Sequence, residues 1–312
     1  MRWALIAAAL ALAGCDTRLT SAPPAVDPSG QAARLVPADL PAFFDCLRQT
    51  EGTAVSAHRG GARDGLPENA LSTFEAAVRE APVFLEIDVR AARDGLVVMH
   101  DETVERTTNG EGAVAEMTVS EVQALPLDNG DAHPPSLREA LDWANGRTVL
   151  ELDIKQDVRF EDVIAEVRDA NAMGRVVFIT YSVGAAGRLA RLAPEAMLYV
   201  TITSTRDLDE LERRGVNLAH VVAWTGDEEP NTELNTALAQ RGVEARFGPF
   251  GRNAPANQAA AFAETGLQII STDEPAAVVA DLDANDGVEG YGALTCVGAS
   301  HGSDGSLWIS EG

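Results

Sequence analysis

Short apolar runs alternate with amphipathic stretches along most of the chain, and this alternation predicts strands separated by helices. Eight runs rich in β-branched and other apolar residues have the length of buried strands, at residues 53–57, 83–89, 148–154, 176–181, 197–202, 219–224, 243–247 and 268–272. Helical stretches lie between most of them, at residues 69–80, 136–144, 160–171, 185–192, 206–214, 231–241 and 255–264. This order favours an α/β protein with a closed parallel (β/α)8 TIM barrel, and a doubly wound open sheet is the alternative.

One segment departs from this alternation. After the second strand, Asp94-Gly95 precedes the apolar run 96–99 and His100. Asp-Gly between two apolar runs is a hairpin signal. We therefore expect a β-hairpin extension after strand 2, which would return His100 to the mouth of the barrel.

The N-terminus has the features of an export signal. Arg2 precedes an apolar run that is too short to cross a bilayer as a helix. The tetrapeptide Leu12-Ala13-Gly14-Cys15 resembles a bacterial lipobox, which implies a signal peptide over residues 1–14 and a lipid on Cys15. Asp16 resembles an inner-membrane retention signal, so we expect a lipoprotein on the periplasmic face of the inner membrane. An ordinary signal peptide or a buried N-terminal helix are the alternatives.

The remaining chain divides into three parts. Residues 15–50 are expected to form a flexible tether and N-terminal segment, residues 51–280 the barrel domain, and residues 281–312 a C-terminal tail. Cys46 and Cys296 lie on either side of the barrel. Export would place them in an oxidising space, so we expect a disulfide that clasps the two ends, with two buried free thiols as the alternative.

Composition narrows the function classes. The 48 acidic and 24 basic residues give a net charge of −24, which argues against a nucleic-acid partner. No protein partner is indicated. The hydrophobic content of 46% is sufficient for a full core. Lys155 is the single lysine among the basic residues, which makes it a candidate functional residue.

Polar side chains gather at the ends of three predicted strands. His58 and Arg59 follow the first strand, and the sequences Glu86-Ile87-Asp88 and Glu151-Leu152-Asp153-Ile154-Lys155 lie in the second and third. Alternate residues of a strand face the same side, so the carboxylates are expected to converge in the barrel mouth. They would repel one another unless the lysine or a cation intervened. All-oxygen ligands suit Mg²⁺ or Ca²⁺.

An ordered series of motifs resembles the glycerophosphodiester phosphodiesterases. The series is His58-Arg59-Gly60, Pro67-Glu68-Asn69, Glu86-Ile87-Asp88-Val89, Asp94-Gly95, Val98-Met99-His100-Asp101 and Arg106-Thr107-Thr108-Asn109-Gly110. Weaker matches include Leu152-Asp153-Ile154-Lys155 and Thr272-Asp273-Glu274-Pro275, and extend the resemblance over about residues 54 to 280.

The resemblance implies a barrel that hydrolyses glycerophosphodiesters to sn-glycerol 3-phosphate and an alcohol with a divalent cation, Ca²⁺ or Mg²⁺. It implies His58 and His100 as the catalytic pair, with His58 expected as the base and His100 as the acid. Glu86, Asp88 and Asp153 would be the metal ligands.

The other site residues follow from the same resemblance. Arg59 and Lys155 would contact the phosphate of a small phosphodiester substrate. Glu68, Asn69 and Glu151 are expected to support the site, and Asn69 would also cap the helix 69–80.

Two departures leave alternatives open. Asp153 stands where the family usually has glutamate, so this ligand would bind through water or be joined by Glu151. Phe247 stands near the position of the family's usual tryptophan. Aspartate at the position of Asp153 resembles spider-toxin-type phospholipases D, so a lysophospholipase D-like or sphingomyelinase D-like phosphodiesterase is one alternative. A non-catalytic phosphate-ester-binding lipoprotein is the other.

Overall fold

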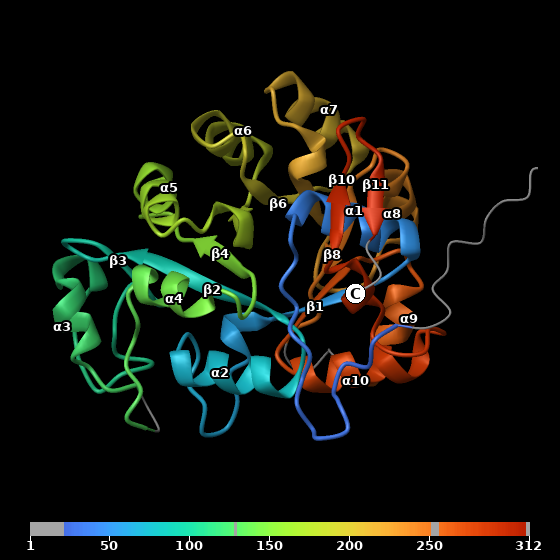
Figure 1. The fold of residues 1–312 in the computed structure, drawn as a ribbon. Coiled ribbons are helices and arrows are strands. Elements are labelled where there is room, and N and C mark those ends of the chain that lie inside the picture. Colours follow the sequence, from blue (N-terminus) through green and yellow to red (C-terminus); the bar gives the residue numbers. More distant parts are fainter. Residues whose placement is uncertain (1–21, 128–129, 251–255, 310–312) are drawn as a thin grey trace, which may run out of the picture.

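Eight parallel strands close into a barrel with helices between them, which confirms the predicted (β/α)8 fold (Figure 1). The computed structural model describes residues 22–127, 130–250 and 256–309. The barrel strands are β1 (Ala54–Ala57), β2 (Phe84–Ala91), β4 (Leu150–Ile154), β5 (Val176–Thr180), β6 (Met197–Thr201), β7 (Val221–Trp224), β8 (Glu244–Phe247) and β9 (Ile269–Thr272). Pairing of β1 with both β2 and β9 closes the ring.

The helices form the outer layer and bury one apolar stripe each. Leu208 and Leu211 are the buried residues of α7, for example, at the spacing of one helical face. The helices around the barrel are α2 (Leu71–Glu80), α4 (Leu137–Ala144), α5 (Phe160–Asp169), α6 (Val183–Leu192), α7 (Thr205–Arg213), α8 (Thr232–Ala239), α9 (Ala259–Ala263) and α10 (Pro275–Asn285).

The register of β2 and β4 brings their acidic residues side by side. Glu86 pairs with Glu151, and Asp88 pairs with Asp153. Neighbours in register on parallel strands face the same side. All four carboxylates therefore point into the barrel, in two layers.

The hairpin expected after the second strand is present. Strand β3 (Leu96–Val98) runs antiparallel to β2, with Val89 opposite Val98. The Met99 amide then donates to the Asp88 carbonyl at 3.0 Å, so His100 lies beside the C-terminal end of β2. The outer side of the hairpin packs with α3 (Val119–Gln123) in a small separate apolar cluster that includes Val97 and Val122.

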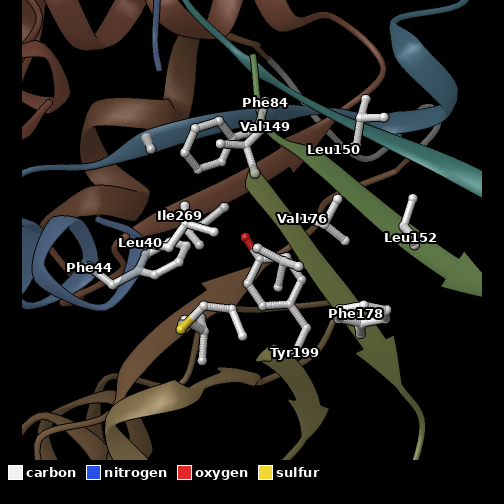
Figure 2. Packing of buried hydrophobic residues seen from close by; sticks show 14 of the residues in the cluster. Leu40, Phe44, Phe84, Val149, Leu150, Leu152, Val176, Phe178, Tyr199 and Ile269 are labelled. Carbon is white, nitrogen blue, oxygen red and sulfur yellow. The ribbon is translucent and has the colours of Figure 1, made fainter. Parts of the chain in front are cut away.

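The last part of the N-terminal segment 15–50 is a helix. Residues 40–50 form α1 (Leu40–Thr50), capped by Asp39, whose side chain accepts from the Ala42 amide. The buried Phe44 ring packs against Phe84 at the start of β2, with the ring centroids 6.4 Å apart (Figure 2). The Phe43 ring is also buried, 5.5 Å from Phe84. The apolar residues of α1 are spaced so that they lie on one helical face. This face packs at the start of β2, so the helix closes the N-terminal end of the barrel.

The C-terminal segment packs back against α1. The expected domain boundary at residue 280 falls inside α10, and the antiparallel hairpin of β10 (Ala299–His301) and β11 (Leu307–Ile309) lies beside α1 (Figure 1). A disulfide joins Cys46 in α1 to Cys296, with the two Cα atoms 5.6 Å apart. Cys15 and the signal segment lie outside the described residues. Within those residues, the helices lack the length and apolar character needed to span a bilayer.

Candidate active site

Three buried carboxylates meet at the C-terminal ends of β2 and β4. One oxygen each of Glu86, Asp88 and Asp153 lies within 4.8 Å of the others. Burial raises the pKa of Glu86 well above its usual value, and the negative charges of Asp88 and Asp153 raise it further. The cluster thus concentrates oxygen ligands and negative charge, which is the chemistry that hard divalent cations prefer.

The single lysine sits against this cluster. Lys155 Nζ lies 2.5 Å from Asp88 Oδ1 and 2.6 Å from Asp153 Oδ2. Burial opposes ionisation of both partners, but their mutual attraction outweighs it: the pKa of Asp88 is lowered and that of Lys155 is raised. The Tyr181 hydroxyl donates to the other oxygen of Asp153 at 2.5 Å, so both oxygens of Asp153 have protein partners.

Asn69 fixes the orientation of Asp88. Its side-chain amide donates to Asp88 Oδ2 at 2.6 Å, and its carbonyl oxygen accepts from the Asp88 backbone amide at 3.1 Å. Asn69 has a left-handed backbone, with φ of 59°. It is not the helix cap expected from the sequence, because α2 begins at Leu71 and Ala70 occupies the cap position. Its polar groups are used by the site instead.

A tight turn after β1 brings Arg59 to the same carboxylates. The Arg59 amide donates to Glu86 Oε2 at 2.7 Å, and its guanidinium donates to Glu68 at 2.9 Å. Arg59 Nε is buried without a hydrogen-bond partner among the described residues and lies 3.8 Å from Asp88 Oδ2. Arg59 thus adds positive charge beside the carboxylate cluster.

Each of the two histidines has a carboxylate partner at Nδ1. His58 Nδ1 lies 2.7 Å from Asp273 Oδ1, at the end of β9, and His100 Nδ1 lies 2.6 Å from Asp101 Oδ1. A carboxylate at Nδ1 orients the ring and favours the tautomer in which Nε2 is free to accept a proton. Asp101 and Asp273 both lie in the motifs that carry the family resemblance, but the sequence alone assigned no role to either of them.

Arg106 links His100 to Glu68. It pairs with Asp101 and donates to both oxygens of Glu68, at 2.6 and 3.0 Å. Hydrogen bonds from Arg106 and His100 hold the pKa of Asp101 below its usual range. Burial works to raise the pKa of Glu68, but Arg106 and Arg59 outweigh it and lower that pKa. Glu68 thus ties the turn after β1 to the segment after β3.

Glu151 does not join the three clustered carboxylates. It lies one layer deeper, where Oε2 is 2.6 Å from Arg246 Nη1 and accepts from Ser56 Oγ at 2.5 Å. The Tyr199 hydroxyl donates to Oε1 at 2.9 Å. Arg246 lies on β8, so its pairing with Glu151 crosses the interior of the barrel. Glu151 is therefore not placed beside Asp153 as an additional ligand, because it lies outside the group of three carboxylates and pairs with Arg246 instead.

A pocket of about 190 Å³ opens beside His58, Glu86 and Asp153. Trp224 and Phe250 form an aromatic wall, with rings stacked 5.9 Å apart at 11°. Phe247, expected as the pocket aromatic, is fully buried outside the pocket lining and packs on Phe262. The alternation of strand β8 explains the difference, because Arg246 takes the inward position and Phe247 the outward one.

Comparison with known proteins identifies relatives of this arrangement. A family model described as the glycerophosphoryl diester phosphodiesterase family matches residues 58–277. A glycerophosphodiester phosphodiesterase of Caldanaerobacter subterraneus is 32% identical over 155 residues, which cover 46% of this chain and 63% of the relative.

Solved structures agree in fold. A glycerophosphoryl diester phosphodiesterase from Parabacteroides distasonis has a TM-score of 0.73 and 26% identity, and the match covers 80% of this chain and 94% of that one. A glycerophosphodiester phosphodiesterase from Agrobacterium tumefaciens has a TM-score of 0.62 and 25% identity, with 72% and 98% of the two chains covered.

Proposed function

Because the chain belongs to the glycerophosphoryl diester phosphodiesterase family, we propose that it hydrolyses glycerophosphodiesters to sn-glycerol 3-phosphate and an alcohol. One observation carries the proposal: two histidines with carboxylate partners lie at the same end of the barrel as three clustered carboxylates. A binding protein for phosphate esters would need the basic residues, but it would have no use for two paired histidines beside them.

The three clustered carboxylates fit a divalent cation, Ca²⁺ or Mg²⁺. Glu86, Asp88 and Asp153 would hold it, since they offer oxygen ligands from two adjacent strands in a buried position. When bound, such a cation acts as a Lewis acid that neutralises developing charge on phosphate oxygens. Lys155 and Tyr181 both bond to Asp153 and would keep its side chain, which is shorter than that of glutamate, in place.

The protein's own groups divide the remaining work. Arg59, whose guanidinium lies beside the carboxylate cluster, would contact a non-bridging phosphate oxygen. His58 Nε2 would accept a proton from the attacking water as the water oxygen bonds to phosphorus. His100 Nε2 would donate a proton to the alcohol oxygen as the bond from phosphorus to that oxygen breaks. Asp273 and Asp101 would hold the two rings in the required orientation.

Turnover of glycerophosphocholine and glycerophosphoethanolamine by the purified full chain, with Ca²⁺, Mg²⁺ or EDTA, tests the proposal. We expect EDTA to abolish release of glycerol phosphate. His58→Ala and His100→Ala should each lower kcat by about 10²- to 10⁴-fold. His133→Ala is the control, because His133 is exposed and contacts only a backbone carbonyl among the described residues.

Three results would contradict the proposal. Retained turnover in both histidine variants would exclude their catalytic roles. Turnover of lysophosphatidylcholine without turnover of either glycerophosphodiester would favour the lysophospholipase D-like alternative. Binding of a phosphodiester with no turnover under any metal condition would favour a non-catalytic protein.

We also propose that a lipid on Cys15 anchors the protein to the periplasmic face of the inner membrane. The lipobox-like tetrapeptide supports this, and a Cys46–Cys296 disulfide is compatible with an oxidising compartment. In a bacterial host, the full chain should fractionate with the inner membrane, and Cys15→Ala should release it from that fraction. Equal membrane association of both forms would exclude a lipid on Cys15.

A further inference from the structure

A second cavity lies beside the candidate active site. This groove, of about 560 Å³, is lined by residues of α5 and α6 and of the segments that follow β4 and β5. Ile179, Thr180 and Tyr181 line both the groove and the aromatic pocket. Lys155, which contacts Asp88 and Asp153, lines the groove as well. A ligand that reacts at the site can therefore extend into the groove past Tyr181.

The groove carries positive charge on a strongly acidic protein. Arg159, Arg188 and Arg191 line it, and Glu161 is the one acidic residue among the described lining residues. The net charge of the chain is −24, so this local excess of arginine opposes the overall field. Such a local concentration favours an anionic ligand.

The arginines of α6 form no ion pair with any residue that the structure describes. Within the described part of the chain, Arg188 and Arg191 have no carboxylate partner, and the Arg188 guanidinium lies over the Phe160 ring at 5.7 Å. Arg159 is 71% exposed, and its nearest carboxylate oxygens, at 3.8 and 3.9 Å, are beyond hydrogen-bond distance. These guanidinium groups can therefore donate to a ligand.

We propose that the groove binds the alcohol part of the substrate and selects glycerophosphodiesters whose alcohol carries a second phosphodiester. This inference rests on the proposed function. Guanidinium groups match phosphate oxygens in geometry and charge, and the apolar side chains of Val158, Phe160 and Ile179 can contact the intervening carbons. An acyl chain would fill such a groove without needing its three arginines.

The deacylated double phosphodiester 1,3-bis(glycerophospho)glycerol has this chemistry. Water would add to one phosphorus, and the bond from that phosphorus to the central glycerol would break. The leaving oxygen takes up a proton, so the products are glycerol 3-phosphate and glycerophosphoglycerol. The second phosphodiester stays intact and would lie among the arginines during the reaction.

The test compares kcat/KM for 1,3-bis(glycerophospho)glycerol and for glycerophosphocholine, whose alcohol has no anionic group. In the full chain, Arg188→Ala and Arg191→Ala should each lower the ratio of the two values about tenfold, or about 1.4 kcal/mol, through a higher KM for the double phosphodiester. Arg188→Lys and Arg191→Lys, which keep the charge, should restore part of the ratio.

Arg79→Ala is the matched control, because Arg79 is exposed in the last turn of α2, at the opposite end of the barrel. It removes the same charge and should leave the ratio unchanged. An unchanged ratio in the α6 variants, with glycerophosphocholine still hydrolysed, would overturn the groove assignment alone. The groove assignment would also be overturned if the α6 variants lost only binding to anionic phospholipid vesicles, or only turnover of lysophosphatidylcholine. No turnover of either glycerophosphodiester by the parent protein would instead refute the proposed function.

Discussion

Each carboxylate at the mouth of the barrel depends on a neighbour that fixes it. Asp88 is held from two sides, by the Asn69 amide at 2.6 Å and by Lys155 Nζ at 2.5 Å. Asp153 is held by Lys155 and Tyr181. Fixed ligands lose less conformational entropy on binding an ion, so these contacts should set the affinity for the cation.

Asn69→Ala tests this at the level of one residue. Loss of both hydrogen bonds to Asp88 should raise the cation concentration for half-maximal activity about 10- to 100-fold, with a smaller change in kcat at saturating cation. Activity titrated against Ca²⁺ or Mg²⁺ measures the shift. Asn171→Ala is the control, because Asn171 also has a left-handed backbone, with φ of 49°, and is exposed. Equal titration curves for both variants would refute the role of Asn69.

The turn after β1 is the element that gathers the site. In three residues, His58–Gly60, it places His58 beside the pocket, the Arg59 amide on Glu86 and the Arg59 guanidinium on Glu68. The turn achieves this with a left-handed conformation at Arg59 and at the following glycine, with φ values of 50° and 80°. A close approach of the α2 helix makes Gly60 necessary, since a Cβ there would overlap the Phe74 ring.

Gly60→Ala should therefore lower both stability and activity. We expect a loss of about 2–4 kcal/mol in the free energy of unfolding, from the positive φ and the overlap with Phe74. Gly65→Ala separates the two causes, because Gly65 has a similar φ of 79° but open space around its Cβ position. It should cost about 1 kcal/mol. Denaturant unfolding measures the free energy of unfolding of both variants. Equal losses in the two variants would exclude the overlap with Phe74 as a cause.

At the scale of the whole molecule, segments before and after the barrel close it opposite the candidate site. Helix α1, the disulfide and the β10–β11 hairpin form this closure. A series of polar contacts links these elements. Glu244 at the start of β8 pairs with Arg48 at 2.7 Å, and Arg48 also pairs with Asp45. Asp45 in turn lies 3.0 Å from His301 in β10. Burial raises the pKa of Glu244 to about 7, although Arg48 opposes the rise.

This buried carboxyl group predicts a pH dependence of stability. The folded state holds the Glu244 proton more tightly than the unfolded state does, so its contribution is fully favourable below pH 4.5. That contribution is lost as the pH rises to about 7, with a total of about 3 kcal/mol. Glu244→Gln should therefore reduce the decline in unfolding free energy between pH 5 and 8. Glu75→Gln is the control, because Glu75 pairs with Arg147 on the surface. Identical pH profiles in parent and Glu244→Gln would contradict the raised pKa.

Local periodicity alone predicted the alternation of strands and helices and most of the acidic cluster, but it left an open doubly wound sheet as an alternative to the barrel. A strand alternates its faces every two residues whatever its partners are, so Glu86 and Asp88 share a face, as do Asp153 and Lys155. The spacing of Leu40, Phe43, Phe44 and Leu47 after Asp39 is equally local, and it was a readable signal for α1 that the apparent tether composition obscured.

Only the closed barrel decided which side chains meet across it. The partner of His58 is 215 residues away at Asp273, and Arg246 reaches Glu151 from the far side of the ring. These pairings depend on strand register and ring closure, which bring distant segments together and which no local pattern encodes. The family resemblance indicated Phe247 as the pocket aromatic, but the alternation of β8 turns Phe247 outward, and the tertiary structure places Trp224 and Phe250 in the pocket instead.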